Sequence, residues 1–401
     1  MLPRDVRDGA QPRLTAQGPG PHRPPRLLLL TPDFPPARGG IQVFAQRLAE
    51  NLTGFSAQVV TRDSPGARER DATSGLWIRR VSAGTCPGVG GRLGAARHVP
   101  LNAVALLEAL RSRPQVTLSM HIVTSPSAAV IRRALGARTV QYFHANEIPD
   151  KPTLTRFAAR RADRSIAVSS YTAQLLESRG VGPAGVRIVP PGVDLPSDSR
   201  VQPPSIHPTI LTVARLHDRY KGHDVLIRAL VAVRARVPGV EWVVIGDGPL
   251  RLELERLARD EGVGDVARFL GQVPDEQRDE WLRRTDLLAM PSRLPGGELA
   301  GEGFGIVYLE AGAHGKPVVA GNVAGARDAV IDGETGLLVD PTDERAVADA
   351  ITRLLLDREL ARRLGEGGAR RARELTWPRI AQRVEAVLFE ALGYASRGAP
   401  A

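Results

Sequence analysis

The chain has 401 residues, of which 42% are apolar and 24% are charged, a balance typical of a folded globular protein. A chain of this length usually divides into more than one domain, so two domains are expected. The single cysteine, Cys86, excludes an internal disulfide and a cysteine-based zinc cluster. No segment reaches about 18 uninterrupted apolar residues, and residues 1–25 lack the apolar run of a secretory signal, so we predict a disordered tail and a cytoplasmic protein.

The formal net charge is +10, and almost every basic residue is an arginine. Two interpretations are open: attraction to an anionic partner such as a membrane surface, or a general bias toward arginine. Nucleic acid is not an expected partner, because aromatic residues make up only 4% of the chain and no binding motif interrupts the basic ones. The arginines that favour a peripheral membrane contact are Arg132, Arg133, Arg138, Arg156, Arg160, Arg161 and Arg164.

The first half of the chain alternates short apolar runs with amphipathic stretches. The run RLLLLTPDF, residues 26–34, is typical of a buried parallel strand, and a glycine loop and a helix-like pattern over residues 41–52 follow it. Further strands are predicted at 57–61, 76–81, 115–120, 138–144 and 164–170. This order of strand, loop and helix predicts a mostly parallel sheet in an α/β domain.

The alternation restarts after a stretch rich in Pro, Ser and Asp. Strands are predicted at 209–215, 241–248, 267–271, 286–292, 316–321 and 336–340, and a final amphipathic helix at 377–392. We therefore predict a tail (1–25), an N-terminal Rossmann-like acceptor domain (26–195), a linker (196–208), a C-terminal Rossmann-like donor domain (209–376) and a helix that packs on a domain surface (377–395). Ligands are expected in a cleft between the carboxyl ends of the two sheets.

The segment EGFGIVYLEAGAHGKPVV, residues 302–319, has the pattern of an anion site. A helix that begins near Gly305 leaves the backbone N–H groups of Gly305, Ile306 and Val307 without partners, which suits a phosphate. Glu302 precedes the helix and Glu310 lies five residues inside it, so the two carboxylates could hold sugar hydroxyls on either side of a diphosphate. The alternative is that both are solvated glutamates near a helix end.

A second segment, TVARLHDRYKGHDVLIRAL (212–230), places Arg215 and Lys221 on the loop after a strand. An arginine fork and a lysine ammonium together suit a departing diphosphate. Lys221 is one of only three lysines in the chain. The alternative is a pair of solvated surface cations.

The order of several motifs resembles that of family 4 glycosyltransferases of the GT-B fold. The similarity extends from Arg26 to about Leu392 and includes GGIQVFAQRLAENL, YFHANE, RLHDRYKGHDVLIRAL, GDGPL, FLGQVPDEQ and EGFGIVYLEAGAHGKPVVAG. Through DFPPARGGIQ and EGFGIVYLEA it is most similar to bacterial phosphatidylinositol mannosyltransferases. The resemblance implies two Rossmann-like domains facing each other across a cleft. It also implies a retaining transferase that moves a hexose, with mannose favoured, from a nucleotide-sugar to a lipid, polysaccharide or small-molecule acceptor.

Residue roles follow from the same resemblance. It implies GDP-mannose as the favoured donor, with a UDP-sugar next. In the segment after strand 316–321 the chain departs from the family, because Arg327 and Asp328 stand where Pro and Glu are common, which weakens inference about the donor sugar. The implied catalytic residues are His144, Arg215, Lys221 and Glu302, and the implied donor-binding residues are Gly39, Gly40, Val273, Phe304, Gly305, Ile306, Val307 and Glu310.

No Asp-X-Asp triplet occurs in the chain, so we expect no metal ion and no other cofactor. Two other functions are weighed. One is a sugar-nucleotide epimerase or hydrolase on the same fold, which would consume donor without acceptor. The other is a catalytically silent lipid-binding or scaffold protein, which the joint presence of Arg215, Lys221, Glu302 and Glu310 disfavours.

Overall fold

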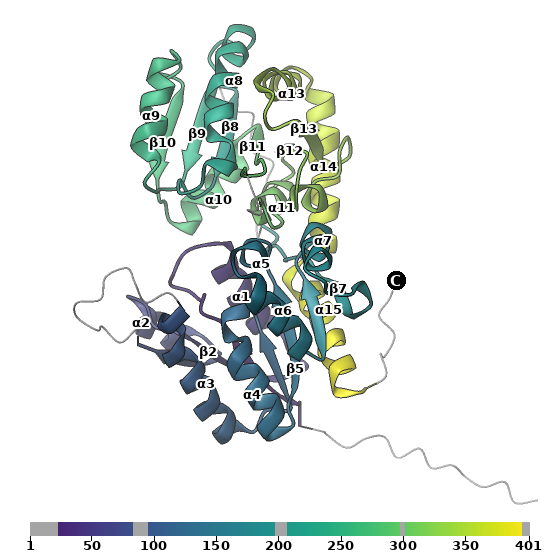
Figure 1. The fold of residues 1–401 in the computed structure, drawn as a ribbon. Coiled ribbons are helices and arrows are strands. Elements are labelled where there is room, and N and C mark those ends of the chain that lie inside the picture. Colours follow the sequence, from purple (N-terminus) through teal and green to yellow (C-terminus); the bar gives the residue numbers. More distant parts are fainter. Residues whose placement is uncertain (1–22, 83–94, 197–206, 297–300, 395–401) are drawn as a thin grey trace, which may run out of the picture.

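The computed structural model describes residues 23–82, 95–196, 207–296 and 301–394. It contains two parallel-sheet halves, stacked one on the other (Figure 1). This confirms the predicted α/β fold with two Rossmann-like units. Most of the predicted tail at 1–25 and of the predicted linker at 196–208, together with Cys86, lies outside the described residues.

Within the described residues, the N-terminal half contains a seven-stranded sheet of order β3-β2-β1-β4-β5-β6-β7. All neighbouring strands are parallel. Six of the strands were predicted, whereas β7 was not, because it has three residues of which two are exposed. The strands are β1 (Arg26–Leu30), β2 (Ser56–Arg62), β3 (Trp77–Val81), β4 (Val116–Ser119), β5 (Arg138–Phe143), β6 (Arg164–Ala167) and β7 (Val186–Ile188).

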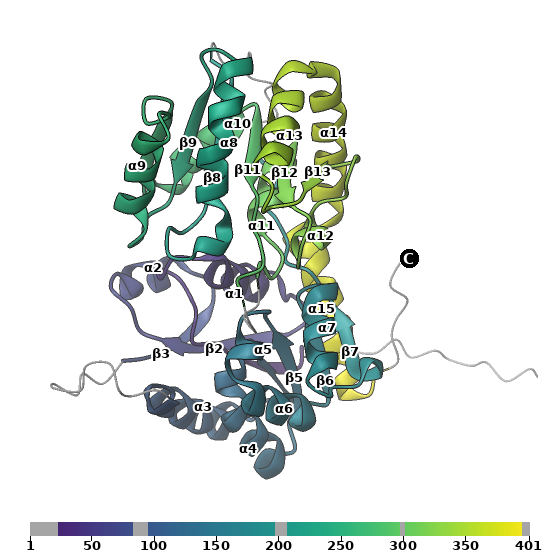
Figure 2. The same cartoon turned by 45° about the horizontal axis from the view of Figure 1, so that its top comes forward.

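Helices cover both faces of this sheet, which is why its central strands are continuous apolar runs. Three helices, α3 (Val99–Ser112), α4 (Ser125–Leu135) and α6 (Pro152–Arg161), lie side by side on one face (Figure 2). The other face is covered by α1 (Gly40–Asn51) and α15 (Trp377–Leu392). Shorter helical elements complete this half: α2 (Ala67–Thr73), α5 (Glu147–Asp150), α7 (Ser170–Ser178), η1 (Ala95–His98), η2 (Ile122–Thr124) and η3 (Pro183–Gly185).

The C-terminal half is built in the same way on a sheet that, in the described ranges, has six parallel strands in the order β10-β9-β8-β11-β12-β13. Strand residues alternate between two apolar clusters, one on each face of the sheet. In both halves the first strand lies between the second strand and a later one, which is the switch point where open α/β sheets bind ligands. The strands are β8 (Thr209–Val213), β9 (Glu241–Ile245), β10 (Ala267–Gly271), β11 (Leu287–Met290), β12 (Val318–Gly321) and β13 (Gly336–Val339).

Two helices of this half cross at very short range because glycines face each other. A β-carbon on Gly312 of α11 (Ile306–Ala313) would lie 3.0 Å from the carbonyl oxygen of Gly368 in α14 (Arg358–Glu374). A larger residue at either position would push α11 away from α14. The remaining helices are α8 (His223–Arg236), α9 (Arg251–Asp260), α10 (Asp275–Arg284), α12 (Ala326–Ala329), α13 (Glu344–Leu356) and the short η4 (Arg219–Lys221).

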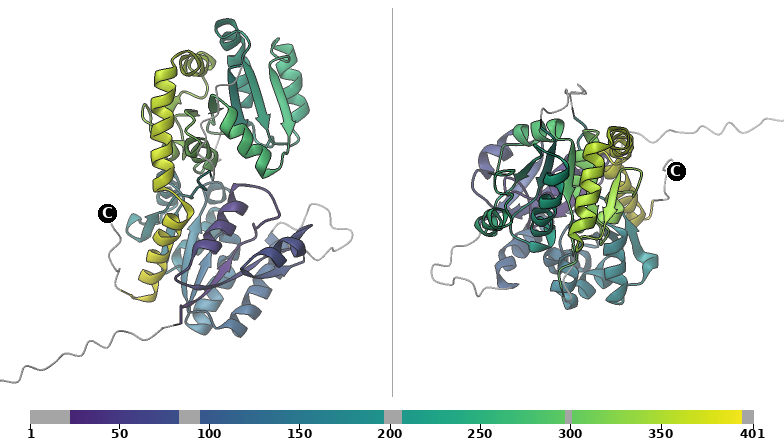
Figure 3. Two further views of the ribbon diagram at one scale, coloured as in Figure 1. Left: turned by 180° about the vertical axis from the view of Figure 1, so that it is seen from behind. Right: turned by 90° about the horizontal axis from the view of Figure 1, so that it is seen from above.

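The chain returns to the N-terminal half at its end. Helix α14 lies in the C-terminal half, and α15 continues from it along the N-terminal sheet (Figure 3). The two crossings of the chain touch, because Val193 and Thr376 form a β-bridge and the Val193 N–H donates to the carbonyl of Leu375 over 2.9 Å. Trp377 then stacks on Phe44 with ring centroids 5.7 Å apart, so an apolar core joins the two halves.

Candidate active site

The loops at the carboxyl ends of the two sheets meet, and we call this region the junction. A β-carbon on Gly40, at the start of α1, would lie 3.6 Å from Cδ1 of Ile306, at the start of α11. Similarly, a β-carbon on Gly303 would lie 3.6 Å from Cβ of Ala145. The two halves therefore approach to van der Waals distance at both places.

The junction is also held by polar contacts between the halves. The Arg38 guanidinium donates to Oε1 of Gln272 over 3.1 Å. The N–H and hydroxyl of Ser170 both donate to the Asp328 carboxylate, over 3.1 and 2.9 Å. Asp328 is one of the two residues that depart from the family pattern, and here it binds the first turn of α7.

Lys221 and Glu302 form an ion pair at the centre of the C-terminal side of the junction. Each side chain is only 12% exposed, and the Lys221 ammonium donates to the Glu302 carboxylate. Burial opposes the charged ammonium, but Glu302 and the neighbouring Tyr220 outweigh it and raise the pKa of Lys221. Gly222 allows this position, because its φ of 79° is left-handed and a β-carbon there would lie 2.2 Å from the Pro291 carbonyl oxygen.

Arg215 lies near this pair but is far more open. Its side chain is 61% exposed and its nearest recorded carboxylate partner is Asp218, at 4.0 Å. The charge of Arg215 acts on both Lys221 and Asp33. It lowers the pKa of Asp33, which burial raises, and the pKa of Lys221, which Glu302 raises. The structure therefore brings Arg215 and Lys221 together as two cations at the junction, one buried and paired and one accessible to a ligand.

Helix α11 begins at the junction as the sequence predicts. Gly305 precedes it with a left-handed φ of 90°, and a β-carbon there would lie 2.3 Å from the Tyr308 ring. Phe304 is 3% exposed and Val307 is 9% exposed, so both side chains anchor the turn in the core. The backbone N–H groups of this turn form the amino-terminal end of α11. The first N–H groups of a helix have no partner inside it and attract anions. Glu302 thus lies beside an amino-terminal helix end.

Glu310 lies on the same helix, but its carboxylate has a partner. Arg278 of α10 approaches it to 3.4 Å, and the Glu310 side chain is 19% exposed. Burial raises the pKa of Glu310, and the nearby Arg278 charge opposes that rise. A ribose that bound Glu310 would have to share the carboxylate with Arg278.

The other predicted donor-binding residues line the edge of the junction. Val273 follows β10 and packs, half-buried, against the core, next to the Gln272 that Arg38 contacts. Gly39 has a φ of 150° and caps α1, where a β-carbon would lie 2.3 Å from the Gln42 side-chain amide. Gly39 therefore allows the tight start of α1, and Gly40 beside it packs against Ile306 of α11.

His144 is placed at the carboxyl end of β5, but its ring is packed more deeply than a freely exposed base. It is 8% exposed, and it stacks on Tyr142 with centroids 5.5 Å apart. Its Nε2 lies 3.0 Å from the carbonyl oxygen of Met120. A carbonyl only accepts, so Nε2 carries the proton and Nδ1 is left as an acceptor. Burial lowers the pKa of His144 to about 4, so the ring is neutral at pH 7.

Comparison with known proteins identifies the family. The family model described as "Glycosyltransferase Family 4" matches residues 38–196, and the model described as "Glycosyl transferases group 1" matches residues 198–371. A GDP-mannose-dependent alpha-(1-6)-phosphatidylinositol monomannoside mannosyltransferase of Mycobacterium tuberculosis is 33% identical over 368 residues, covering 86% of this chain and 92% of that protein. The chain belongs to the family 4 glycosyltransferases. The predicted family and enzyme class are thereby confirmed.

Other members of the family extend the comparison. A D-inositol 3-phosphate glycosyltransferase of Nocardia farcinica is 29% identical, over 86% of this chain and 83% of that protein. Among solved structures, sucrose-phosphate synthase from Thermosynechococcus elongatus gives a TM-score of 0.76 at 24% identity, covering 93% of this chain and all of the other. Anabaena HepE in complex with UDP and glucose gives 0.73 at 20% identity, covering 90% and 99%. These structures confirm the GT-B fold.

Several junction residues lie within the quoted motifs but were given no role from the sequence. Asp33 follows β1 at the switch point, and burial raises its pKa although Arg62 and Arg215 oppose the rise. Tyr220 hydrogen-bonds with Asn146, which joins the loop of Lys221 to the loop after β5. The local signals for Asp33 are its place directly after a buried strand and at the start of DFPPARGGIQ.

Glu147 is the centre of a buried polar cluster on the N-terminal side. Its Oε1 accepts the His144 backbone N–H over 2.9 Å, and its Oε2 accepts the Ile122 N–H over 3.1 Å. Oε2 also lies 3.1 Å from Nδ1 of His121. Burial raises the pKa of Glu147 to about 8 and lowers that of His121 to about 3, so both groups are mostly neutral at pH 7, and Nδ1 of His121 accepts the Val123 N–H over 3.2 Å.

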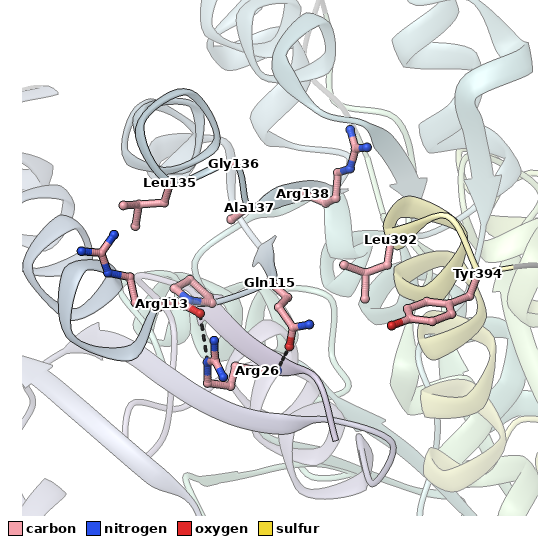
Figure 4. Close-up of a pocket in the computed structure, with 10 residues that line it drawn as sticks. Arg26, Arg113, Gln115, Leu135, Gly136, Ala137, Arg138, Leu392 and Tyr394 are labelled. Atoms are coloured by element: carbon pink, nitrogen blue, oxygen red, sulfur yellow. Dashed lines mark hydrogen bonds between the residues drawn. The ribbon is translucent and has the colours of Figure 1, made fainter. Parts of the chain in front are cut away.

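The predicted basic patch is partly neutralised and lies away from the junction. Arg132 forms two bonds of 2.9 Å with Asp163, which Arg138 also contacts, and Arg164 lies 3.6 Å from Glu390. A polar cavity of 420 Å³ opens near Arg26, Arg113 and Arg138 at the amino ends of the strands (Figure 4). It is at the opposite end of the sheet from the junction, so it is not part of the candidate active site.

Two features of the described residues bear on the predicted location and on the predicted absence of a metal ion. Within those ranges, no helix is both long and apolar enough to cross a membrane. In the same ranges, no three His, Cys, Asp or Glu side chains gather where they could hold a metal ion. The cytoplasmic location and the absence of a cofactor stay predictions.

Proposed function

We propose that this glycosyltransferase transfers mannose from GDP-mannose to an inositol phospholipid, with retention of anomeric configuration and without a metal ion. The choice of donor and acceptor is supported by the mycobacterial relatives, which are 33% identical and named for GDP-mannose and phosphatidylinositol monomannoside. The second candidate acceptor is a water-soluble inositol phosphate, which is supported by the 29% identical D-inositol 3-phosphate glycosyltransferases.

The observation that carries the proposal is the convergence of Lys221, Arg215 and the start of α11. Cleavage of the bond between the sugar and the diphosphate leaves extra negative charge on the leaving phosphate. Two cations and an amino-terminal helix end stabilise such charge more strongly than water does, because they are already oriented. Lys221 keeps its charge for this role, since Glu302 raises its pKa despite burial.

The transfer step uses the two faces of the junction differently. The acceptor hydroxyl oxygen forms a bond to the anomeric carbon on the face from which the diphosphate departs. The bond from that carbon to the phosphate oxygen breaks, and the hydroxyl proton moves to the departing phosphate, giving the mannoside and GDP. Glu302 positions hydroxyls of the transferred sugar, and Glu310 binds the donor ribose. His144, neutral at pH 7, offers Nδ1 as an acceptor to a sugar hydroxyl.

The proposal is tested with purified enzyme, GDP-mannose or UDP-glucose as donor, and either phosphatidylinositol in detergent micelles or inositol 3-phosphate as acceptor. All reactions contain EDTA. We expect α-linked mannosyl lipid from GDP-mannose, with the anomeric configuration read by NMR. A β-linked product would overturn retention, and activity only on added Mg²⁺ would overturn metal independence.

The same assay separates the other readings. Preference for UDP-glucose would overturn GDP-mannose as the proposed donor. Transfer to inositol 3-phosphate but not to the lipid would favour the second candidate acceptor. Donor consumption at an equal rate without any acceptor would indicate a hydrolase or an epimerase. Each of these outcomes is read from one set of product analyses.

A further inference from the structure

An apolar cavity of 450 Å³ lies on the outer face of the N-terminal half, between α3, α4 and α6. Its volume is in the range of sites that hold small ligands. Most of the surface that faces it is apolar, which differs from the polar cavity at the other end of the sheet. The apolar side chains that line it include Val99, Leu106, Val123, Pro126, Val130 and Leu154.

The apolar side chains of this cavity are unusually open for a folded protein. Val99 is 63% exposed and Val130 is 49% exposed, although both line the cavity. Ala103 lies between them on α3 and is exposed as well. A contiguous apolar surface that stays exposed marks a binding site more often than a scattered one does.

The end of the cavity nearest the junction is polar and basic. His98 and Lys151 line it there, and the His98 ring is 7% exposed. Arg97 donates to Nε2 of His98 over 3.1 Å, so in the neutral ring Nδ1 carries a proton, and Nδ1 is buried with no hydrogen-bond partner among the described residues. Such a donor costs free energy unless an acceptor reaches it.

The charges at this end favour an anionic group. After burial, the largest effects that lower the pKa of His98, to about 4, come from Arg62, Arg97 and Lys151. Within the described residues, neither Arg62 nor Arg97 has a carboxylate within ion-pair distance, whereas Lys151 pairs with Asp150. Two guanidinium groups therefore act on His98, which lines the cavity, and neither forms an ion pair within the described residues.

The basic end of the cavity points toward the candidate active site. Helices that follow parallel strands begin at the carboxyl edge of a sheet and lead away from it, so the starts of α3, α4 and α6 face the junction. His98 and Lys151 precede α3 and α6, and both of their charges act on His121, at the end of β4. His121 in turn contacts Glu147, which binds the His144 backbone.

We propose that this cavity holds an acyl chain of the lipid acceptor, with its phosphate at the basic end and its sugar headgroup in the junction. The proposal rests on the lipid acceptor put forward above and adds the surface that would select it. An anionic head joined to an apolar tail matches the order of the features, which run from cations at the junction to apolar side chains away from it.

The test fills the cavity without touching the candidate active site. Ala103→Trp places a large ring in the cavity, and Leu110→Trp places the same ring on the same helix, at a residue that is 54% exposed and does not line the cavity. KM is measured for dipalmitoyl phosphatidylinositol in micelles and for its deacylated, water-soluble headgroup. We expect Ala103→Trp to raise KM about tenfold for the lipid only, which corresponds to losing the burial of about two methylene groups.

Leu110→Trp should change neither KM. An unchanged KM for the lipid in Ala103→Trp would overturn the proposal, and so would an equal rise for the lipid and the soluble headgroup. If the wild type mannosylates neither acceptor, the proposed function fails, and the cavity is tested by the binding of phosphatidylinositol that carries a fluorescent acyl chain. Saturable binding that weakens about tenfold in Ala103→Trp would support the cavity, and equal binding by both proteins would overturn it.

Discussion

The two sides of the junction handle charge in opposite ways. The C-terminal side keeps ionised groups, since Lys221 is paired with Glu302 and Arg215 is open to solvent. The N-terminal side buries groups that stay neutral at pH 7, because burial lowers the pKa of His144 to about 4 and raises that of Glu147 to about 8. The C-terminal half therefore supplies the buried ion pair, and the N-terminal half adds buried hydrogen-bonding groups that carry no charge at pH 7.

This difference suits the proposed chemistry. The leaving diphosphate gains negative charge and needs cations, and the C-terminal side supplies Lys221 and Arg215. The anomeric carbon gains positive charge at the same moment, so a protonated histidine beside it would oppose the reaction. A neutral His144 next to the sugar avoids that repulsion while it still accepts a hydrogen bond.

Removal of a cation on the C-terminal side should produce the largest effect. We expect Arg215→Ala and Lys221→Ala each to lower kcat/KM by about 10²–10³-fold, because each removes a preoriented stabiliser of the leaving group. Steady-state kinetics with a radiolabelled donor measure the loss. Arg219→Ala is the matched control, since Arg219 lies on the same loop, is 61% exposed and pairs with Glu253.

The two cation variants differ in their effect on folding. Lys221→Ala leaves the buried Glu302 without its partner and should lower the free energy of unfolding, by about 3–5 kcal/mol. Arg215 is mostly exposed, so Arg215→Ala should keep the wild-type Tm. Activity within threefold of wild type in Arg215→Ala, with Tm unchanged, would contradict the assignment of charge to this side.

The comparison is sharpened by two left-handed glycines, one in each half. Gly305→Ala places a β-carbon 2.3 Å from the Tyr308 ring, whereas a β-carbon on Gly136, whose φ is 70°, meets nothing within 4 Å. Gly136→Ala should therefore cost about 1–2 kcal/mol from its backbone conformation alone. Gly305→Ala should cost more and should also raise the donor KM, because the start of α11 must move.

Urea unfolding and donor kinetics of both glycine variants test this expectation. The unfolding free energies should differ by about 2 kcal/mol or more, since a clash with a buried ring adds to the strain. An unchanged donor KM in Gly305→Ala, together with the expected loss of stability, would remove the start of α11 from the donor site. Equal stability losses in the two variants would show that the turn before α11 relaxes freely.

The neutral side predicts a specific pH dependence of stability. The pKa of Glu147 is raised above its ordinary value to about 8, so its contribution to stability is fully present at low pH and is lost as the pH rises through 8. Between pH 7 and 8 this loss should amount to about 1 kcal/mol. The histidines with lowered pKa offset part of this loss, because about a quarter of each is still protonated at pH 7 in the unfolded state. This offset is the same in wild type and in a variant of Glu147, so the difference between the two reports Glu147 alone.

Urea unfolding at pH 7 and pH 8 measures this loss. Glu147→Gln cannot ionise, so it should flatten the decline in that range, whereas Glu276→Gln, at an exposed position of α10, should not. The same decline in wild type and Glu147→Gln would mean that another group causes it. In that case Glu147 would not be neutral at pH 7, which would contradict the neutral character of the N-terminal side.

Most of the fold could be predicted because buried parallel strands consist largely of consecutive apolar residues. Twelve of the strands in the described ranges were predicted, most of them from such runs, and β7 was missed because Arg187 and Ile188 are exposed. The start of α11 could also be predicted, because Gly303 and Gly305 mark a turn before an apolar helix. These features depend on neighbours in the chain.

The rest of the site depends on contacts between distant segments. Lys221 and Glu302 are separately recognisable, but 81 positions separate them, and only the packing of η4 against the loop before α11 makes them a pair. Asp33 and Asn146 gain their place only when the two halves meet. The depth of His144 likewise depends on Phe44 of α1, which lies 100 residues earlier in the chain.

The smallest predicted effect concerns the contact that joins the two sides at their edge. Asp328 accepts two hydrogen bonds from Ser170, and an asparagine there keeps one acceptor but loses the charge. Asp328→Asn should therefore weaken the junction by about 1 kcal/mol and lower kcat/KM about fivefold, with the chemistry of Lys221 and Arg215 intact. Asp349→Asn, at a 68% exposed carboxylate paired with Arg236, is the control.

The split between KM and kcat decides how the two sides cooperate. If the halves must be held together for the cations to meet the donor, Asp328→Asn raises the donor KM and leaves the pH dependence of kcat unchanged, and small-angle scattering shows a larger radius of gyration. If kcat alone falls and the scattering is unchanged, Asp328 acts on the reacting groups instead. The division into a charged side and a neutral side would then be too simple, because a carboxylate at the edge would take part in the chemistry of both.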